Sequence, residues 1–164
     1  MKITFFVPGI PKTAGSKRGI PIYRGKKGHK QFTSKVVVVE DCKKSADWRG
    51  DVIKFATEAI KGIGAPITGP VSLEVCFCFT RPKSHYGTGR NKKTIKPSAP
   101  TCHTKKPDIT KLLRAVEDAL TGIVWGDDSQ IIRQLATKDY ASVNGADIEI
   151  ETAKNFIKWH RRIK

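Results

Sequence analysis

The chain has 164 residues, and its 31 lysines and arginines against 15 aspartates and glutamates give a formal net charge of +16. This length is typical of a single domain with a modest core. No apolar run approaches the roughly 18 residues that a membrane-spanning helix needs, and the opening MKITFFVPGIP is too short in apolar residues for a signal peptide. We therefore expect one cytoplasmic domain over residues 1–164, with no membrane partner.

Apolar patterning predicts the elements of the first half in chain order. Alternation predicts a strand over residues 2–8, and glycine- and lysine-rich residues 9–35 then indicate a long loop or arm. Residues 36–40 (VVVVE) fit either a short strand or the start of a helix. Three-and-four spacing predicts a helix over residues 41–61, and alternation predicts a strand over residues 71–79.

The second half continues with a segment that cannot pack much core, residues 80–107, which we interpret as a second long loop. A helix over about residues 109–121 follows, then strands over 129–141 and 145–153, and a basic tail compatible with helix over 154–164. This order predicts an α+β fold. We expect a single two-layer domain in which a mixed sheet of about four strands packs against two main helices, with long basic loops.

Charge is segregated along the chain. Residues 1–39 hold nine basic and no acidic residues, residues 80–107 hold eight and none, and residues 154–164 hold five and none. Residues 108–153 reverse the pattern with nine acidic and four basic residues. A surface that only has to stay in solution would mix the two signs. The segregation indicates basic arms for a polyanion around a separate acidic locus.

The four cysteines give a weaker signal. Cys76 and Cys78 lie two apart in a predicted strand, so they share one face. A zinc site could combine them with Cys102 and His103, but the short paired spacings of structural zinc motifs are missing. We expect reduced, mostly buried thiols.

Acidic residues lie at both ends of the second predicted helix, Asp108 before it and Asp127–Asp128 after it. One interpretation is structural, with Asp108 or Thr110 capping the helix and the aspartate pair forming a turn. The other is that the carboxylates converge on a divalent cation. Magnesium prefers such oxygen ligands, and at a phosphodiester it can activate water and stabilise the leaving oxygen.

The segment KPDITKLLRAVEDALTGIVWGDDSQI, residues 106–131, resembles the signature segment of the RusA family of Holliday junction resolvases of bacteria, prophages and phages. FFVPGIPKTAGSKR, RPKSHYGTGRN and GADIEIE are also similar to phage-type members. The resemblance implies a homodimeric endonuclease that depends on Mg²⁺, or Mn²⁺ in its place, and uses no small-molecule cofactor. It also implies symmetrical nicks in four-way DNA junctions, in the cytoplasm or nucleoid of a bacterial host.

The resemblance further implies roles for individual residues. Asp108 matches the family's first catalytic aspartate, and Asp128 matches the aspartate after the helix, with Asp127 as its acidic neighbour. Arg114 stands where the family commonly has a catalytic lysine. A guanidinium can keep the phosphate contact but is unsuited to proton transfer. Asp118 either has a structural role or orients Arg114 from one helical turn away.

Thr110 departs from the family pattern, which has a second catalytic aspartate there. Either cleavage is weakened or lost, which leaves a junction-binding protein, or another carboxylate takes over. Glu117 is seven residues on, about two turns along the same helical stripe. The second explanation predicts a metal site of Asp108, Glu117, Asp127 and Asp128, with Arg114 as a further catalytic residue.

Basic residues of both arms and of the helix start are expected to contact phosphates rather than bases. They are Lys12, Lys17, Arg18, Arg24, Lys26, Lys27, Lys30, Arg81, Lys83, Arg90, Lys92, Lys93 and Lys111. Two other classes stay open: a junction-binding protein without cleavage, and a generic basic RNA-binding protein. An RNA-binding module has no need for acid at both ends of one helix.

Overall fold

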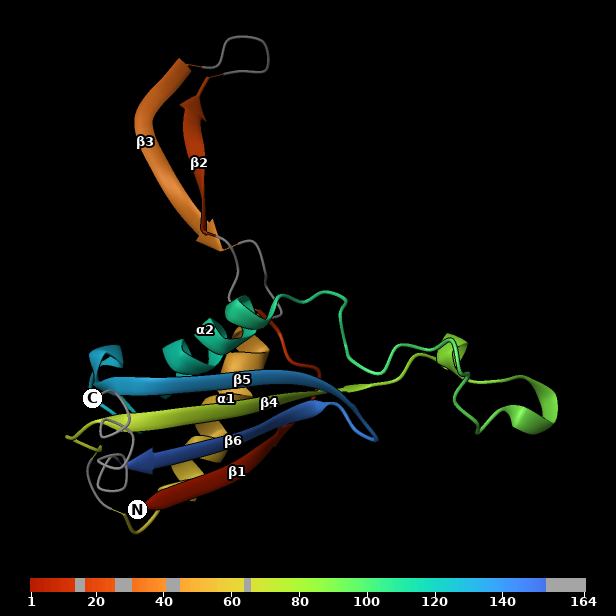
Figure 1. Cartoon of the computed structure of the whole chain (residues 1–164). Helices are drawn as coiled ribbons and strands as arrows, with labels where there is room; N and C mark the ends of the chain where they lie inside the picture. The colour runs from red at the N-terminus through yellow and green to blue at the C-terminus, as the bar shows by residue number, and fades with distance from the viewer. Residues whose placement is uncertain (14–16, 26–30, 41–44, 64–65, 153–164) are drawn as a thin grey trace, which may run out of the picture.

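The computed structural model describes residues 1–13, 17–25, 31–40, 45–63 and 66–152 (Figure 1). The predicted tail over residues 154–164, the cations Lys26, Lys27 and Lys30, and Cys42 lie outside this range. The main elements are β1 (Lys2–Pro8), β2 (Lys17–Arg24), β3 (Gln31–Glu40), α1 (Ser45–Ala59), β4 (Val71–Thr80), α2 (Ile109–Leu120), β5 (Ile131–Ala141) and β6 (Gly145–Thr152).

Four strands form a mixed sheet in the order β1-β6-β4-β5. The strand β6 lies antiparallel to both β1 and β4, whereas β5 runs parallel to β4. Parallel neighbours need a long crossover, and here the crossover contains the long loop and α2. The predicted α+β fold, with a mixed four-stranded sheet and two main helices, is confirmed.

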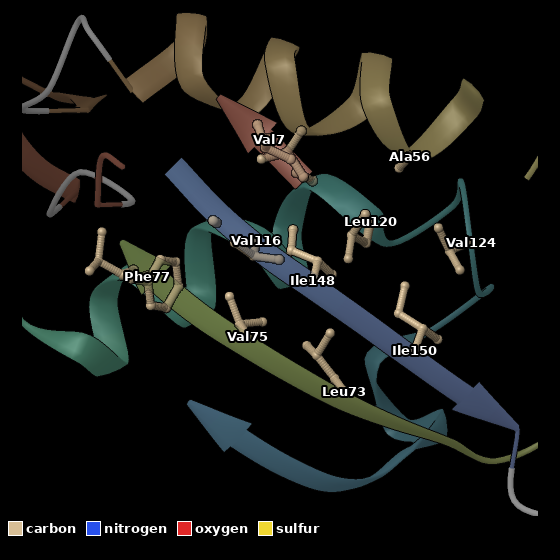
Figure 2. Close-up of a cluster of buried hydrophobic side chains, with 14 of the residues drawn as sticks. Val7, Ala56, Leu73, Val75, Phe77, Val116, Leu120, Val124, Ile148 and Ile150 are labelled. Carbon is tan, nitrogen blue, oxygen red and sulfur yellow. The ribbon is translucent and has the colours of Figure 1, made fainter. Parts of the chain in front are cut away.

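The core fills the space between the sheet and the two helices (Figure 2). Alternate residues of the strands point into it, among them Val7, Leu73, Phe77 and Ile148, and all are buried. From α2 the buried face consists of Leu112, Ala115, Val116, Ala119 and Leu120. This spacing of three and four residues packs one side of α2 on the sheet and leaves the other side free for function.

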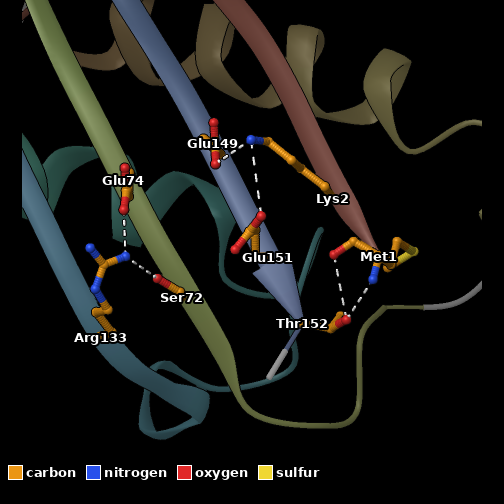
Figure 3. A network of polar contacts seen from close by, with 8 residues as sticks. All are labelled: Met1, Lys2, Ser72, Glu74, Arg133, Glu149, Glu151 and Thr152. Carbon is orange, nitrogen blue, oxygen red and sulfur yellow. Dashed lines mark hydrogen bonds and ion pairs between the residues drawn. The ribbon is translucent and has the colours of Figure 1, made fainter. Parts of the chain in front are cut away.

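The opposite face of the sheet carries no described helix, and its residues are mainly polar. Lys2 on β1 pairs with Glu149 of β6 at 2.7 Å, and Arg133 of β5 pairs with Glu74 of β4 (Figure 3). By strand alternation and register, the acidic residues of this face outnumber its two basic ones; they are Glu74, Asp139, Asp147, Glu149 and Glu151. We call this the open face.

The cysteines lie partly at this face. Cys76 and Cys78 share it as predicted, and Cys76, Cys78 and Cys102 are free thiols. Cys76 and Cys78 are half-buried and Cys102 is exposed, so the expectation of mostly buried thiols is wrong for these three. Burial, followed by the neighbouring Cys76, raises the pKa of Cys78 to about 11. A thiol held protonated in this way is a poor metal ligand.

Residues 9–35, predicted as a long loop or arm, contribute to a projecting arm, but this arm is built from strands and is not a loop. The strands β2 and β3 form an antiparallel hairpin that projects from the body of the molecule (Figure 1). Residues 36–40, which fit a strand or a helix start, belong to β3. Ile20, Ile22, Val36 and Val37 on this hairpin are exposed. Because neither face packs on the core, the hairpin lacks the apolar alternation that reveals a strand in sequence.

Residues 81–107 form the second projection. They contain two single 3₁₀ turns, Lys83–His85 and Gly89–Asn91, and one bridge between Tyr86 and Ile95. The predicted long loop is thus confirmed, with short local structure of its own. No helix in the described ranges has the length and apolar character that would let it cross a membrane.

Candidate functional site

The C-terminal end of α2 turns sharply into the segment that carries the aspartate pair. Gly122 adopts a positive φ of 80°, a conformation that side chains disfavour, and its N–H donates to the carbonyl of Trp125 at 2.7 Å. The side chain of Trp125 is fully buried in the core. The turn therefore fixes the next residues, up to Asp128, against the body of the protein.

Asp128 is anchored by this turn although its residue is exposed. Its Oδ1 accepts hydrogen bonds from the hydroxyl of Thr121 and, at 3.3 Å, from the indole Nε1 of Trp125. Thr121 is itself the C-cap of α2, and its N–H donates to the carbonyl of Glu117 at 3.0 Å. Asp128 is thus tied directly to the last turn of α2.

Glu117 lies on that last turn and is half-buried. Burial raises its pKa, and the negative charges of Asp128 and then Asp118 raise it further. The amide of Gln134 on β5 donates to Glu117 Oε1 and, together with the charge of Arg114, opposes this rise. Glu117 and Asp128 therefore form a pair of like charges, held close by α2, the turn and β5.

Asp127 has a structural role. It is the N-cap of a 3₁₀ turn, Asp128–Gln130, and its side chain accepts the N–H of Ser129 at 2.8 Å. Hydrogen bonding by the Ser129 side chain, followed by its backbone N–H, lowers the pKa of Asp127. Gln130 returns the contact by accepting the N–H of Asp127 at 3.0 Å, which completes a capping box. The structural interpretation of this aspartate as a turn residue is confirmed.

The other end of α2 has a different character. Asp108 is the N-cap by position but makes no side-chain capping bond, so the predicted capping by Asp108 is wrong. Its carboxylate is exposed and lies 3.4 Å from the ammonium of Lys111. A groove of about 390 Å³ opens beside it, with Lys12, Lys106 and Lys111 in its lining. Its remaining lining residues are Ile10, Pro11, Thr13 and Pro107.

Both basic projections arise beside this groove. Residues 10–13 of its lining lead into β2, and residues 106–107 end the long loop (Figure 1). Lys138 of β5 fixes the loop by donating to the carbonyls of Lys105 at 2.8 Å and Pro107 at 2.9 Å. The Lys106–Pro107 peptide bond is cis. The N-terminal end of α2 is therefore a cationic groove that contains one exposed carboxylate, paired with Lys111.

The predicted convergence of Asp108, Glu117, Asp127 and Asp128 does not occur within one chain. With 12 residues and a rise of about 1.5 Å per residue, α2 separates Asp108 from Asp128 by roughly 18 Å. Within the described residues, no three His, Cys, Asp or Glu side chains are grouped so that they could hold one metal ion. This applies equally to the zinc site considered from sequence. Of the four predicted ligands, Glu117 and Asp128 lie at the same end of α2, where burial, and then the charge of Asp128, raises the pKa of Glu117.

Thr110 and Arg114 lie on the exposed side of α2. Among the ion pairs of the described residues, none joins Arg114 to Asp118 or to Glu117. Arg114 nevertheless acts on Glu117 through its charge. It is therefore free to contact a phosphate near the Glu117–Asp128 pair.

The predicted phosphate-contacting residues differ in how free their side chains are. Lys83, Arg90, Lys92 and Lys93 are exposed on the long loop, and Arg24 is exposed on β2. For Lys17 and Arg18 the structure describes only the place on β2. Arg81 is already engaged: it donates to the carbonyls of Pro100 at 2.8 Å and Thr101 at 3.2 Å. We assign Arg81 to anchoring the loop rather than to a free phosphate contact.

Rings at the end of the sheet complete this anchor. His103 stacks on Phe79 with ring centroids 4.3 Å apart and lies 5.2 Å from the ring of Tyr140. The guanidinium of Arg81 lies over the Tyr140 ring, 4.1 Å from its centroid. Burial lowers the pKa of His103, and the charge of Lys138 lowers it further.

Three residues of the site were not singled out from sequence: Thr121, Trp125 and Gln134. Their side chains hold Asp128 and Glu117. The signal available was the turn between the helix and the aspartate pair, TGIVWG, where a glycine stands next to the helix end and a tryptophan comes shortly before the two aspartates.

Comparisons with known proteins agree with this geometry. The family model described as endodeoxyribonuclease RusA matches residues 21–151, which include both ends of α2. An uncharacterized protein of Bacillus subtilis (strain 168), YqaN, is 32% identical over 84 residues. That match covers 51% of this chain and 58% of YqaN, so the chain spans little more than half of the relative's length.

Proposed function

Because the chain belongs to the RusA family of endodeoxyribonucleases, we propose that it is a magnesium-dependent endonuclease that resolves four-way DNA junctions by paired, symmetrical nicks. The observation that carries this proposal is the placement of Glu117 and Asp128 at one end of α2, where the Thr121 hydroxyl contacts both Asp128 Oδ1 and the carbonyl of Glu117. Two like charges placed close together repel each other, and a cation bound between the two carboxylates would remove this repulsion. We propose that this DNA is cut in the bacterial cytoplasm.

The donor set fits magnesium. Glu117 and Asp128 supply oxygen atoms alone, and magnesium commonly takes one or two carboxylates and completes its shell with waters and substrate phosphate oxygens. A bound ion would supply activated water and charge stabilisation at the leaving oxygen. Gln134 and Thr121 hold the two carboxylates in place, so little rearrangement is needed before binding.

The remaining residues bind and orient the DNA. Arg114 lies on the exposed side of α2 near the carboxylate pair, where it can contact the phosphate to be cut. The groove lysines Lys12, Lys106 and Lys111 can hold a neighbouring phosphate at the other end of the helix. The two basic projections extend this cationic surface outwards (Figure 1), as the broad arms of a four-way junction require.

We propose a homodimer in which each metal site draws on both protomers. Asp108 and Asp128 of one chain lie at opposite ends of a rigid helix, so a site that includes both must combine Asp108 of one protomer with Asp128 of its partner. A two-fold dimer holds two such sites. Two symmetry-related sites would explain paired nicks in a substrate with matching symmetry.

Mixing two inactive variants tests this shared site. Asp108→Asn and Asp128→Asn are each expected to be inactive as homodimers. In a mixed dimer, one shared site carries both substitutions and the other carries neither, so single nicks should return. If each protomer instead contains its own complete site, every site in the mixture is damaged and no nicks appear.

The activity itself is tested on a synthetic four-way junction and a linear duplex of the same sequence. We expect nicks in the junction with magnesium, and none with chelator or in the duplex. Paired nicks are scored by ligating the products. Cleavage that persists in chelator would contradict the role of the metal.

Thr110 supports a second candidate, a junction-binding protein without cleavage, because the family pattern has an aspartate at this position. The same assay separates the two. Junction-specific binding without nicks in the presence of magnesium would favour the second candidate. Restoring the carboxylate with Thr110→Asp should then produce nicks.

A further inference from the structure

Two side chains converge on one oxygen of Asp128. The indole Nε1 of Trp125 lies 3.3 Å from Asp128 Oδ1 and 3.2 Å from the hydroxyl oxygen of Thr121, which contacts the same Oδ1. In the part of the chain that the structure describes, no hydrogen bond reaches Asp128 Oδ2. One oxygen of this exposed carboxylate is therefore held and the other is left open.

The donors are themselves rigid. The Trp125 side chain is fully buried, and its backbone carbonyl accepts the N–H of Gly122 at 2.7 Å. The adjoining Val124 carbonyl accepts the N–H of Ile67 at 2.8 Å, which joins the turn to the connector before β4. Thr121 is fixed at the end of α2, where its hydroxyl also lies 2.9 Å from the carbonyl of Glu117.

Burial of a tryptophan does not by itself explain this contact. A buried indole N–H usually finds a partner, yet Trp48 is also buried and its Nε1 has no hydrogen-bond partner. The fold therefore tolerates an unpaired indole at one position. At the other, it directs the N–H onto an exposed carboxylate that could otherwise be solvated by water.

We propose that Trp125 and Thr121 are positioning residues for the metal site. They fix the rotation of the Asp128 carboxyl group so that Oδ2 faces the ion beside Glu117. This inference rests on the proposed function, because it assigns a task to the groups that surround a proposed ligand. Outer hydrogen-bond partners of this kind commonly change metal affinity or activity by about 10–100-fold.

Two substitutions at Thr121 separate positioning from packing. Thr121→Val keeps the shape and removes the hydroxyl, whereas Thr121→Ser keeps the hydroxyl. Trp125→Phe keeps a buried ring and removes the N–H donor. As a matched control, Thr57→Val removes a hydroxyl that donates to the carbonyl of Ile53 at 2.8 Å on α1.

The readout is Mn²⁺ binding to the protein without DNA, measured by calorimetry, together with the metal dependence of junction cleavage. We expect Thr121→Val and Trp125→Phe to bind Mn²⁺ about 10–100-fold more weakly, with cleavage restored at high metal concentration. Thr121→Ser and Thr57→Val should bind Mn²⁺ as the wild type does. Junction binding in chelator should be the same in all five proteins, and thermal unfolding establishes that each is folded.

Three results would overturn the inference, and they are distinguishable. Wild-type affinity for Mn²⁺ in both Thr121→Val and Trp125→Phe, with metal-dependent cleavage intact, removes the positioning role and leaves the proposed function standing. Equal weakening in Thr121→Ser and Thr121→Val shows that the hydroxyl is not responsible. Absence of Mn²⁺ binding and of cleavage in the wild type removes the proposed function and this inference together.

Discussion

The two ends of α2 each carry an aspartate that matches the family pattern, but they place it in opposite surroundings. At the C-terminal end, Asp128 is held by a buried tryptophan and a threonine and faces a second carboxylate. At the N-terminal end, Asp108 has one lysine at 3.4 Å and a cationic groove around it. Negative charge therefore gathers at the C-terminal end of α2, and positive charge gathers at its N-terminal end.

This difference teaches that a motif can be continuous in sequence and divided in space. Within one chain, α2 keeps Glu117 and Asp128 at its C-terminal end apart from Asp108 at its N-terminal end. A second protomer can join them, which makes assembly part of the proposed chemistry. Variants at each end should therefore fail in different ways.

The largest expected effect comes from removing charge at the C-terminal end. Asp128→Asn should lower the junction cleavage rate by more than about a hundredfold, because losing a metal ligand costs more than losing an outer partner. Junction affinity in chelator should stay unchanged. The matched control is Asp118→Asn, which removes a carboxylate from α2 that does not belong to the Glu117–Asp128 pair. Equal losses in the two variants would remove the special status of Asp128.

The N-terminal end should respond through binding instead. Lys106→Ala combined with Lys111→Ala should weaken junction affinity. The slope of the logarithm of the binding constant against the logarithm of salt concentration should also become less steep by about 2, because each phosphate contact contributes about 0.9 to it. Lys54→Ala combined with Lys61→Ala removes two exposed cations from the region of α1. If both double variants show the same slope change, the groove has no special role.

A smaller effect is expected at the loop anchor, which joins the N-terminal end to the sheet. Burial lowers the pKa of His103 below its ordinary value of 6.5, so the unfolded chain binds the proton more readily than the folded one. Stability should therefore be complete above about pH 6.5 and fall as acid protonates this histidine. His103→Phe keeps the ring stack and should lose about 1–3 °C less in melting temperature between about pH 7.5 and 5.5. Identical acid losses in both proteins would contradict the assignment.

The smallest effect concerns the repulsion between Glu117 and Asp128. Since the pKa of Glu117 is raised above its ordinary value of 4.5, its charge costs stability above that pH. The cost disappears as pH falls through the raised pKa. The free energy of unfolding of Glu117→Gln should exceed that of the wild type by a few tenths of a kcal/mol at neutral pH in chelator. In strong acid the two values should be equal. In saturating magnesium the order should reverse, because the ion stabilises the wild type more. Thermal unfolding in both conditions measures each difference.

The sequence predicted those elements whose apolar residues meet the core. Val71–Thr80 and Gly145–Thr152 alternate because one face is buried, and Ile109–Leu120 shows its helical stripe for the same reason. The hairpin was missed because its strands face solvent on both sides. Four consecutive valines in β3 were the available signal, through their β-branched side chains.

The site was predicted in its residue types but not in its arrangement. Acidic residues at both ends of one helix suggested that Asp108 and Asp128 would converge on a cation, yet a helix is a rigid rod and keeps its ends apart. The pairing of Glu117 with Asp128 could be expected only from knowing that β5 returns beside α2, where Gln134 contacts Glu117. Trp125 could not be assigned to Asp128 without the positive φ of Gly122, which sets the direction of the turn.

The acidic open face has a consequence for how DNA approaches. Glu74, Asp147 and Glu149 line its surface hollow, and their charge opposes any polyanion that arrives from that side. A nucleic acid diffusing around the molecule is therefore turned away from the sheet and drawn towards the lysine-rich side. Because Lys2 and Arg133 offset only part of this negative charge, the open face still favours approach from the opposite side of the molecule.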